Sequence, residues 1–341
     1  MKLEDFDFEL PEELIAQHPV DKRDESRLLI LHKNTNAIEH KHFYDIIDYL
    51  HPGDVIVRNN SKVIPARLYG TKLDSGAHVE VLILKTNDKI CECLCGNAKV
   101  IKQGTIIKFS DKLSGECIEV KDEGIRIIKM IYEGIFLEIL NEVGQMPTPP
   151  YIHEKLTNNS RYNNIYASIN GSAACPTAGL HFTDELINRI KEKSVEILDV
   201  TLHVGLGTFK PVKEDNIEDH KMHTEFYSMN KEVADRLNLA KKEGRRIISV
   251  GTTSTRTLET IMNLYGEFKE CSGDTSIFIY PPYKFKAIDC QITNFHLPKS
   301  TLIMMISALC SREMILNAYK IAIKEKYRFF SFGDSMFIDN E

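Results

Sequence analysis

The spacing of apolar residues predicts helices alternating with strands over most of the chain. Thr183 is a favourable N-cap and is followed by two acidic residues, which suits the start of a helix. Leu186, Ile187 and Ile190 then fall on one stripe between charged positions, as in a helix with one buried face. Residues 195–204 alternate apolar and polar side chains instead, as in a strand. By the same reasoning we expect helices at 40–50, 231–243, 257–265 and from 301, and strands at 28–32, 54–57, 245–250, 277–280, 289–295 and 327–332.

The pattern changes between residues 64 and 142. Short runs of β-branched and apolar residues are separated there by Gly, Asp, Asn and Lys, and no helical stripe of useful length is present. Six short strands at this spacing favour a small barrel or a sandwich, since closure removes exposed sheet edges. The expected strands are 79–84, 90–94, 105–109, 117–120, 125–130 and 135–140.

Helices alternate with strands on both sides of this middle segment, which predicts a mixed or parallel sheet covered by helices. Residues 145–151 contain three prolines and form an extended linker that returns the chain to the sheet. The length of 341 residues also favours two domains. We therefore expect an α/β fold with a second, all-β part.

Composition and the apolar runs indicate the class of protein and its compartment. Hydrophobic residues make up 43% and charged residues 27%, as in ordinary globular proteins. The N-terminal sequence MKLEDFDFEL is acidic where a secretory signal is basic and then apolar. The longest uncharged apolar run, 302–309, is far shorter than the roughly 20 residues that span a membrane. We expect a cytoplasmic protein without a membrane contact.

Eight cysteines are too few for a disulfide framework in a chain of this length, so we expect them to be reduced. Cys91, Cys93 and Cys95 would lie on one face of a strand. Their spacing differs from the Cys-x-x-Cys pairs of zinc sites, and we expect no metal.

The formal net charge of −6 gives no support for a nucleic-acid partner. Contact with RNA would need a local basic patch, and two sets of residues are placed to neutralise phosphates. The alternative is that each set is a solvated face. The sets are Lys85, Lys89, Lys99, Lys102, Lys108 and Lys112 in the middle segment, and Lys320, Lys324, Lys326 and Arg328 near the C-terminus.

Candidate chemistry gathers first at the end of the strand 195–204. His203, Gly205 and Gly207 follow one another there, and glycine lets a backbone approach a ligand closely. Ligands of open α/β sheets bind beyond the carboxyl ends of the strands. A histidine beside glycines is also common in ordinary turns. The sequence alone therefore allows both a catalytic histidine and a turn residue at position 203.

A second candidate lies at residues 251–256, between an expected strand and an expected helix. A glycine, four hydroxyl residues and Arg256 at a helix N-terminus would suit a carboxylate or phosphate, because backbone N–H groups point outward there. The alternative is an ordinary capped turn. His296 follows another expected strand.

Several blocks of the sequence resemble one known family. PTAGLHFT (176–183), VTLHVGLGTFKPV (200–212), SVGTTSTRTLE (249–259) and TNFHLPKSTLIMMISA (293–308) are similar to the S-adenosylmethionine:tRNA ribosyltransferase-isomerases of queuosine biosynthesis. The similarity spans nearly the whole chain and is weakest between about residues 69 and 144. It implies a large mixed-sheet α/β domain, residues 1–63 and 148–341, with an inserted small β-barrel domain, residues 64–147.

The resemblance also implies a reaction. The ribosyl group of S-adenosylmethionine is transferred to 7-aminomethyl-7-deazaguanine at the wobble position of tRNA and is isomerised, which gives epoxyqueuosine in tRNA, adenine and methionine. S-adenosylmethionine is consumed, so no cofactor is expected. The expected partner is the anticodon arm of tRNA, and the expected state is a monomer.

Roles can be assigned within this chemistry as hypotheses. The sulfonium acidifies the neighbouring ribose carbon, so a base is needed, and His203 is the first candidate and His181 the second. His296 would protonate the adenine. The substrate-binding residues would be Thr252, Thr253, Ser254 and Arg256 for the methionine carboxylate, Gly205 and Gly207 for the nucleoside, and Glu225 for the sulfonium or α-amino group.

Two other classes of function are consistent with parts of the chain. A non-catalytic RNA-binding module would use the barrel, but the segment lacks a dense aromatic and basic pattern. An unrelated S-adenosylmethionine methyltransferase would suit the α/β part, although no G-x-G-x-x-G follows a strand.

Overall fold

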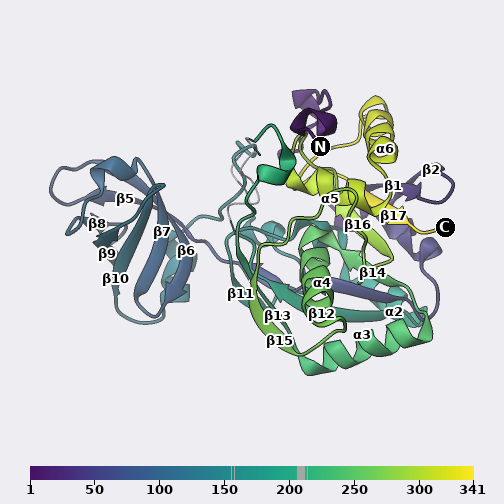
Figure 1. Cartoon of the computed structure of the whole chain (residues 1–341). Helices are drawn as coiled ribbons and strands as arrows, with labels where there is room; N and C mark the ends of the chain where they lie inside the picture. The colour runs from purple at the N-terminus through teal and green to yellow at the C-terminus, as the bar shows by residue number, and fades with distance from the viewer. Residues whose placement is uncertain (155, 157, 206–211, 213) are drawn as a thin grey trace. The chain divides into compact units, whose positions relative to one another are not determined.

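The computed structural model describes residues 1–154, 156, 158–205, 212 and 214–341. These residues form two compact units (Figure 1). The large unit contains Met1–Asn60, Pro149–Ser168 and Pro176–Glu341, and the small unit contains Ser61–Thr148 and Ile169–Cys175.

The large unit is built on a nine-stranded mixed sheet with the order β15-β13-β12-β3-β14-β16-β17-β1-β2. The four central strands β12, β3, β14 and β16 are parallel, while β17 is antiparallel to β16 and parallel to β1. β13, β15 and β2 are antiparallel to their neighbours. The bounds are β1 Arg27–His32, β2 Ile38–His42, β3 Val55–Asn59, β12 Glu196–Leu202, β13 Glu225–Met229, β14 Ile247–Val250, β15 Cys271–Thr275, β16 Cys290–Asn294 and β17 Ser335–Asp339.

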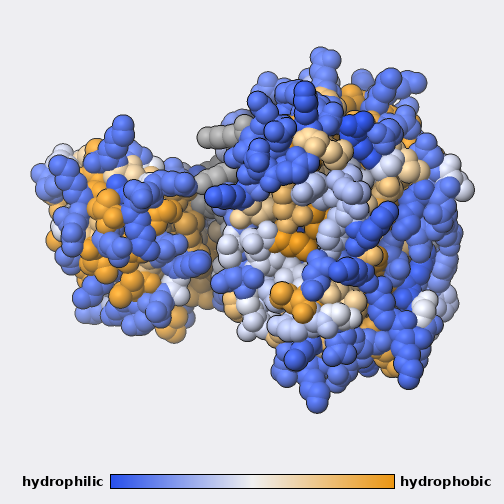
Figure 2. Space-filling model, in the orientation of Figure 1, coloured by the Kyte–Doolittle hydropathy of each residue, from blue (hydrophilic) through white to orange (hydrophobic). Residues whose placement is uncertain are grey.

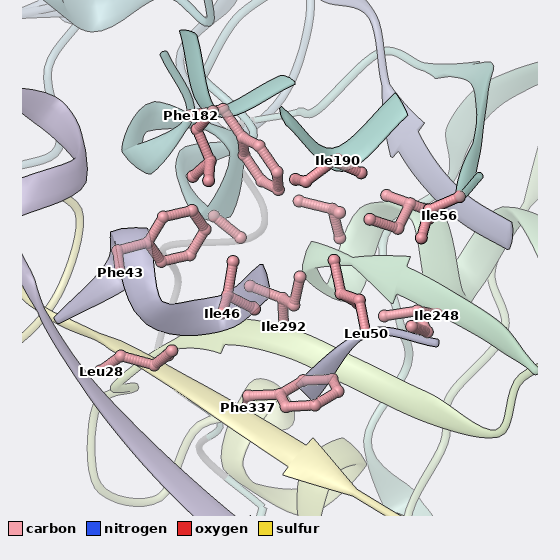
Figure 3. Close-up of a cluster of buried hydrophobic side chains, with 14 of the residues drawn as sticks. Leu28, Phe43, Ile46, Leu50, Ile56, Phe182, Ile190, Ile248, Ile292 and Phe337 are labelled. Atoms are coloured by element: carbon pink, nitrogen blue, oxygen red, sulfur yellow. The ribbon is translucent and has the colours of Figure 1, made fainter. Parts of the chain in front are cut away.

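Helices and short 3-10 turns cover this sheet (Figure 1). On one face a core cluster joins residues from β1, β3, β14, β16 and β17 to the 3-10 segment η4 and helix α2 (Figure 3). Phe43, Phe182 and Phe337 are among its members and are at most 1% exposed. The helices are α2 Asp184–Glu192, α3 Lys231–Glu243, α4 Gly251–Tyr265, α5 Thr301–Leu309 and α6 Arg312–Lys324, and the 3-10 segments used below are η3 Arg23–Glu25, η4 Phe43–Tyr49 and η7 Thr177–His181.

The small unit is a closed six-stranded antiparallel barrel with the order β10-β7-β6-β5-β8-β9. Its interior contains Cys91, Cys93 and Cys95, which lie on one face of β7 as expected, and burial raises the pKa of all three thiols. The expected α/β class, with a large mixed sheet and a small barrel, is confirmed. The bounds are β5 Arg67–Lys72, β6 His78–Asn87, β7 Ile90–Gly96, β8 Ile106–Lys108, β9 Leu113–Val120 and β10 Ile125–Tyr132, with helix α1 Phe136–Val143 and the parallel pair β4 Ser61–Val63 and β11 Ile169–Ser172.

Two predictions within the barrel segment are wrong. Residues 135–140 lie mostly in α1 and not in a strand, because Phe136, Ile139, Leu140 and Val143 repeat at helical spacing. The sixth barrel strand is β5, which was not among the expected strands. Buried and more exposed residues alternate along β5, as in other half-buried strands. One of the buried positions is Gly70, which has no apolar side chain, so the alternation is not visible in the sequence.

Three predictions in the C-terminal half are also wrong. The apolar run after residue 301 forms two helices, since Ser311 caps a second helix and the chain bends by 115° between α5 and α6. Residues 277–280 are outside any strand, and the neighbouring strand is β15. Residues 327–332 are outside any strand apart from an isolated bridge between Phe329 and Ile15, and the last strand is β17.

Near the N-terminus, residues 40–50 do not form one helix but continue β2 and then form η4. No single helix in the described ranges is long and apolar enough to cross a membrane, and α5 with α6 reaches that length only as a bent pair.

Candidate active site

The candidate residues lie at one edge of the large sheet. Because β12, β3, β14 and β16 are parallel, their carboxyl ends meet there, followed by His203, Asn60, Gly251 and Phe295 respectively. β17 and β1 run in the opposite direction, so their first residues reach the same edge. The topology thus brings three chain regions of the expected site to one rim.

His203 leaves the end of β12 beside β13. Its backbone N–H donates to the carbonyl of Phe226 over 2.9 Å, and the two rings stack with centroids 5.7 Å apart. Nδ1 of His203 is buried and has no hydrogen-bond partner within the part of the chain that the structure describes. Burial lowers the pKa of this imidazole. His203 is therefore held as a neutral ring with one nitrogen available to a ligand.

A buried ion pair between Arg256 and Glu225 lies next to His203. One carboxylate oxygen of Glu225 accepts from the backbone N–H of Gly205 over 2.7 Å, and the other oxygen accepts from Nη1 of Arg256. Nη2 of Arg256 donates to the carbonyl of His223. The two charged groups, which we expected to contact different parts of the substrate, are thus bonded to each other.

Among the described residues, none comes close enough to Gly205 to exclude a Cβ there. A Cβ at this position would lie 3.7 Å from the nearest carboxylate oxygen of Glu225, an ordinary contact. Gly207, the second glycine of the motif, lies outside the described residues.

Helix α4 begins at Gly251, six residues before the expected start, so the predicted turn at 251–256 is wrong. Gly251 has φ +82°, and a Cβ there would lie only 3.3 Å from Cβ of Ala178. The hydroxyls that suggested a loop bond back along the helix instead. Ser254 donates to the carbonyl of Val250 over 2.9 Å, and Thr255 donates to that of Gly251 over 3.3 Å.

Two groups on this helix have polar atoms without a partner. Oγ1 of Thr253 and Nε of Arg256 are buried and make no hydrogen bond in the described ranges. Buried polar atoms are bonded in the great majority of cases, so these two are natural contacts for a ligand. Thr252 and Thr253 are each 8% exposed, whereas the hydroxyl of Ser254 is already used.

His181, at the end of η7, is buried and bonded through both ring nitrogens. Nδ1 lies 2.7 Å from Oγ of Ser26, and Nε2 lies 3.2 Å from Nδ2 of Asn294. The same Nδ2 points at the carbonyl of Phe330, and Oδ1 of Asn294 accepts from the hydroxyl of Thr177. This arrangement fixes the amide, so Nε2 of His181 accepts and Nδ1 carries the proton.

The surroundings of His181 keep it neutral. Burial, followed by the positive charges of Arg328 and Arg23, lowers its pKa to about 3. The ring lines a small cavity of about 20 Å³, which holds one water-sized group. Its other walls include Arg23, Arg161 and Ser331.

His296 is bonded in a similar way just after β16. Its Nε2 lies 2.8 Å from the hydroxyl of Thr293, and its backbone N–H donates to Oη of Tyr319. Burial lowers its pKa to about 3. His181 and His296 thus meet consecutive residues at the end of β16, whereas His203 lies over β13.

Helix α4 links the residues around His181 and His296 to those around His203. Its first residue, Gly251, packs on Ala178 of η7, and Arg256 one turn later reaches Glu225 of β13. The predicted residues therefore form two bonded clusters on either side of one helix N-terminus.

Sequence reasoning missed Ser26, Arg23 and Asn294. The first two come from the highly charged turn before β1. The high density of charges in that turn indicated that its side chains bond to other parts of the chain. Asn294 stands inside the motif that contains His296, but its bond to a residue 113 positions away could not be deduced. Among the described residues no group of three or more His, Cys, Asp or Glu side chains is arranged to hold a metal ion.

Comparison with known proteins gives one family. Residues 3–338 match the family described as "Queuosine biosynthesis protein". Two relatives named S-adenosylmethionine:tRNA ribosyltransferase-isomerase, from Clostridioides difficile and Staphylococcus haemolyticus, are 57% and 58% identical over 340 residues, which is 99% of this chain and 100% of each relative. A crystal structure of S-adenosylmethionine tRNA ribosyltransferase from Thermotoga maritima is 40% identical, covers 98% of this chain and 99% of its own, and has a TM-score of 0.57. The chain belongs to the queuosine biosynthesis protein family.

Proposed function

We propose that the protein is an S-adenosylmethionine:tRNA ribosyltransferase-isomerase. It transfers the ribosyl group of S-adenosylmethionine to 7-aminomethyl-7-deazaguanine at the wobble position of tRNA and isomerises it, which gives epoxyqueuosine, adenine and methionine. The observation that carries this proposal is the identity of 57–58% over the full length of relatives with that name. S-adenosylmethionine is a consumed substrate, so the reaction needs no separate cofactor.

His203 is the proposed base. The sulfonium draws electrons from the adjacent ribose carbon and makes its proton removable by a neutral imidazole. Among the three candidate histidines in the described chain, His203 is the one with a buried nitrogen that no protein group occupies. Both ring nitrogens of His181 and Nε2 of His296 are bonded within the protein, and we assign these two histidines to positioning the rim and not to proton transfer.

Binding of the methionine end is proposed for the first turns of α4. Thr253 and Nε of Arg256 offer unused donors, and the dipole of the helix favours a carboxylate near its N-terminus. Thr252 and Ser254 would shape this surface. Glu225 balances Arg256 and holds the N–H of Gly205, which sets the backbone on which the nucleoside would lie, together with Gly207.

Three further points are part of the proposal. The wobble base lies in the anticodon, so the anticodon arm would be the part of tRNA that binds. The enzyme would act as a monomer. Since tRNA and S-adenosylmethionine are both cytoplasmic, the enzyme would act in the cytoplasm. Footprinting of bound tRNA and sedimentation of the free protein test the first two points.

The deciding experiment uses S-adenosylmethionine labelled in either the ribose or the methyl group, with tRNA that carries 7-aminomethyl-7-deazaguanine. Ribose label should enter the RNA while adenine and methionine are released in equal amounts. Methyl label in the RNA would identify a methyltransferase instead. No label from either position, with tRNA still bound, would identify an RNA-binding module.

His203→Ala tests the base. Its turnover should fall by at least about 100-fold, the lower range for loss of a general base, while retention of tRNA on a filter stays intact. His51→Ala is the matched control, because the His51 side chain is 50% exposed and lies before β3 at the opposite edge of the sheet. Full activity of His203→Ala would discard the assignment.

A further inference from the structure

The outer face of the barrel has a groove that none of the roles above uses. It lies where β5 pairs with β6 on one side and with β8 on the other. Its volume is about 450 Å³, within the range of sites that hold a small organic ligand. It is lined by Tyr69, Gly70, Thr71, His78, Val79, Glu80, Lys108 and Phe109.

The strand register sets the order of side chains in this groove. Thr71 pairs with His78 on one side and with Lys108 on the other, so these three form a row across three strands. Tyr69 pairs with Glu80 in the next row on the same face. An aromatic ring, a cationic group and two hydrogen-bonding groups therefore stand side by side.

Gly70 explains how the aromatic residues of the groove are placed. A Cβ at Gly70 would lie 2.6 Å from a methyl carbon of Ile107 and 2.7 Å from the ring of Phe109, which is closer than real Cβ contacts. The absence of a side chain lets Phe109 pack against β5. Tyr69, directly before this glycine, remains 49% exposed. Because Gly70 faces the interior of the barrel, Phe109 packs on the opposite face of β5 from Tyr69. Tyr69 is therefore the aromatic ring of the groove that is open to a planar ligand.

The charges around the groove favour a phosphate. Lys108 pairs with Asp111, but Asp111 is 95% exposed, and such a surface pair exchanges partners at little cost. Glu80 is balanced by Arg67 at 2.9 Å. The small unit carries twelve Lys and Arg against twelve Asp and Glu, while the whole chain has a net charge of −6. The excess negative charge thus belongs to the large unit, and the barrel is the less repulsive surface for RNA.

We propose that this groove binds one unpaired nucleotide of the tRNA substrate, with the base stacked on Tyr69 and the phosphate at Lys108. Many proteins bind single-stranded nucleic acid by stacking a base on an aromatic side chain while a nearby cationic group contacts the phosphate. Thr71, His78 and Glu80 supply donors and acceptors for the base edge or the ribose. The inference rests on the proposed function in that tRNA is taken as the partner.

The hydrophobic surface of the barrel does not account for this groove. Figure 2 shows hydrophobic residues among hydrophilic ones on the visible face of the small unit. Leu73, Ile90 and Ile131 are exposed apolar residues of the barrel, and none of them lines the groove. The lining of the groove is mainly aromatic and polar, as a nucleotide requires, and Val79 is its one branched aliphatic residue.

The first test uses the fact that the chain has no tryptophan. Tyr69→Trp places a single fluorescent reporter in the groove, and tRNA without S-adenosylmethionine should quench it through base stacking. Tyr265→Trp is the matched control, because Tyr265 is 45% exposed and lies on α4 in the large unit, and its fluorescence should not change. Single-stranded RNA should compete for the quench better than duplex RNA of equal length.

The second test separates binding from chemistry. Tyr69→Ala should raise KM for tRNA by about 5- to 150-fold, the effect of losing one stacked base, with kcat and KM for S-adenosylmethionine within about twofold. Lys108→Ala should reduce the slope of log KM against log salt by about 0.7. Lys121→Ala, at an exposed barrel lysine outside both basic sets, should leave KM for tRNA unchanged.

The outcomes are distinguishable. A folded Tyr69→Trp variant whose fluorescence tRNA does not quench, together with an unchanged KM for tRNA in Tyr69→Ala, overturns the proposal. So does a change of oligomeric state in Tyr69→Ala, which would assign the groove to a contact between copies of the chain. If tRNA quenches the reporter but no ribosyl transfer is found with the wild type, the groove proposal stands and the proposed function fails.

Discussion

The side-chain amide of Asn294 donates to Nε2 of His181 over 3.2 Å, and this contact decides what the histidine can do. Because Nε2 accepts, the proton is on Nδ1 and faces Ser26. Both nitrogens are occupied, and burial lowers the pKa of the ring to about 3. At neutral pH His181 is therefore an uncharged link between η7 and the end of β16, and it has no free site for a substrate proton.

This neutrality predicts sensitivity to acid. In the unfolded chain His181 and His296 should titrate near 6.5, whereas in the folded chain both have a pKa of about 3. The unfolded state binds protons that the folded state cannot, so the free energy of unfolding should fall as the pH drops from about 6.5 to 3. Each histidine should contribute up to about 1.4 kcal/mol per pH unit in that window. Urea unfolding at pH 7, 6 and 5 measures this slope.

His181→Gln provides the control for that experiment. An amide can still meet Ser26 and Asn294 but takes up no proton, so the variant should be less stable at pH 7 and have a shallower slope. Carboxylates also titrate in this range, and the difference between the two slopes removes their contribution. Equal slopes for the variant and the wild type would contradict the assigned protonation state.

A second prediction concerns the stack of His203 on Phe226. Burial lowers the pKa of His203, so activity should disappear on the acid side through a pKa below 6.5 if the neutral ring is the base. Phe226→Ala removes a ring centred 5.7 Å away and opens the histidine to water. The acid limb of the pH profile of kcat/KM should then move up toward 6.5. Phe226→Leu should leave the limb in place, and a limb unaffected by either change argues against His203.

The ion pair of Arg256 and Glu225 gives a third prediction. Both side chains are at most 5% exposed, so Arg256→Ala removes the positive charge that balances a buried carboxylate and should cost up to about 3–5 kcal/mol in the free energy of unfolding. It should also raise KM for S-adenosylmethionine. Lys112→Ala breaks an exposed pair with Glu142 and should change stability by less than about 1 kcal/mol.

The double variant Arg256→Ala with Glu225→Ala separates the two effects. It removes both charges, so stability should recover in part compared with the single variant. If Arg256 binds the methionine carboxylate, KM for S-adenosylmethionine stays raised. Recovery of KM together with stability would show that Arg256 acts only by holding Glu225 and the N–H of Gly205.

Elements with an unambiguous period and clear caps could be predicted from the sequence. α3 has the expected bounds, 231–243, because Asn230 caps its start and Gly244 ends it in the left-handed conformation. α2 begins after Thr183, whose hydroxyl accepts from the N–H of Leu186. In each case local hydrogen bonds and the buried stripe favour the same structure.

Where local signals conflict, the prediction was wrong. The segment 136–143 is both β-rich and spaced for a helix, and a short apolar run does not distinguish the two. The run after 301 is continuously apolar, so the break before Ser311 depends on packing that the sequence does not reveal. The site was predictable as a strand end with His203, but the bonds of His181 join segments far apart in the chain.

The last prediction concerns the start of α4, where Gly251 has φ +82° and faces Ala178. Gly266, at the other end of the helix, has φ +76°, and a Cβ added there would have no atom within 4 Å. Alanine at either position must adopt a left-handed conformation, which costs about 1–2 kcal/mol. Only Gly251→Ala must also push η7 away through a 3.3 Å contact.

Gly251→Ala should therefore lower the free energy of unfolding more than Gly266→Ala does, and thermal unfolding of both variants measures the difference. Because η7 carries His181 and α4 carries Thr253, the shift should also raise KM for S-adenosylmethionine in Gly251→Ala alone. The strain common to both variants cancels in this comparison. A KM that rises equally in both would mean that the helix as a whole, and not its contact with η7, controls the substrate site.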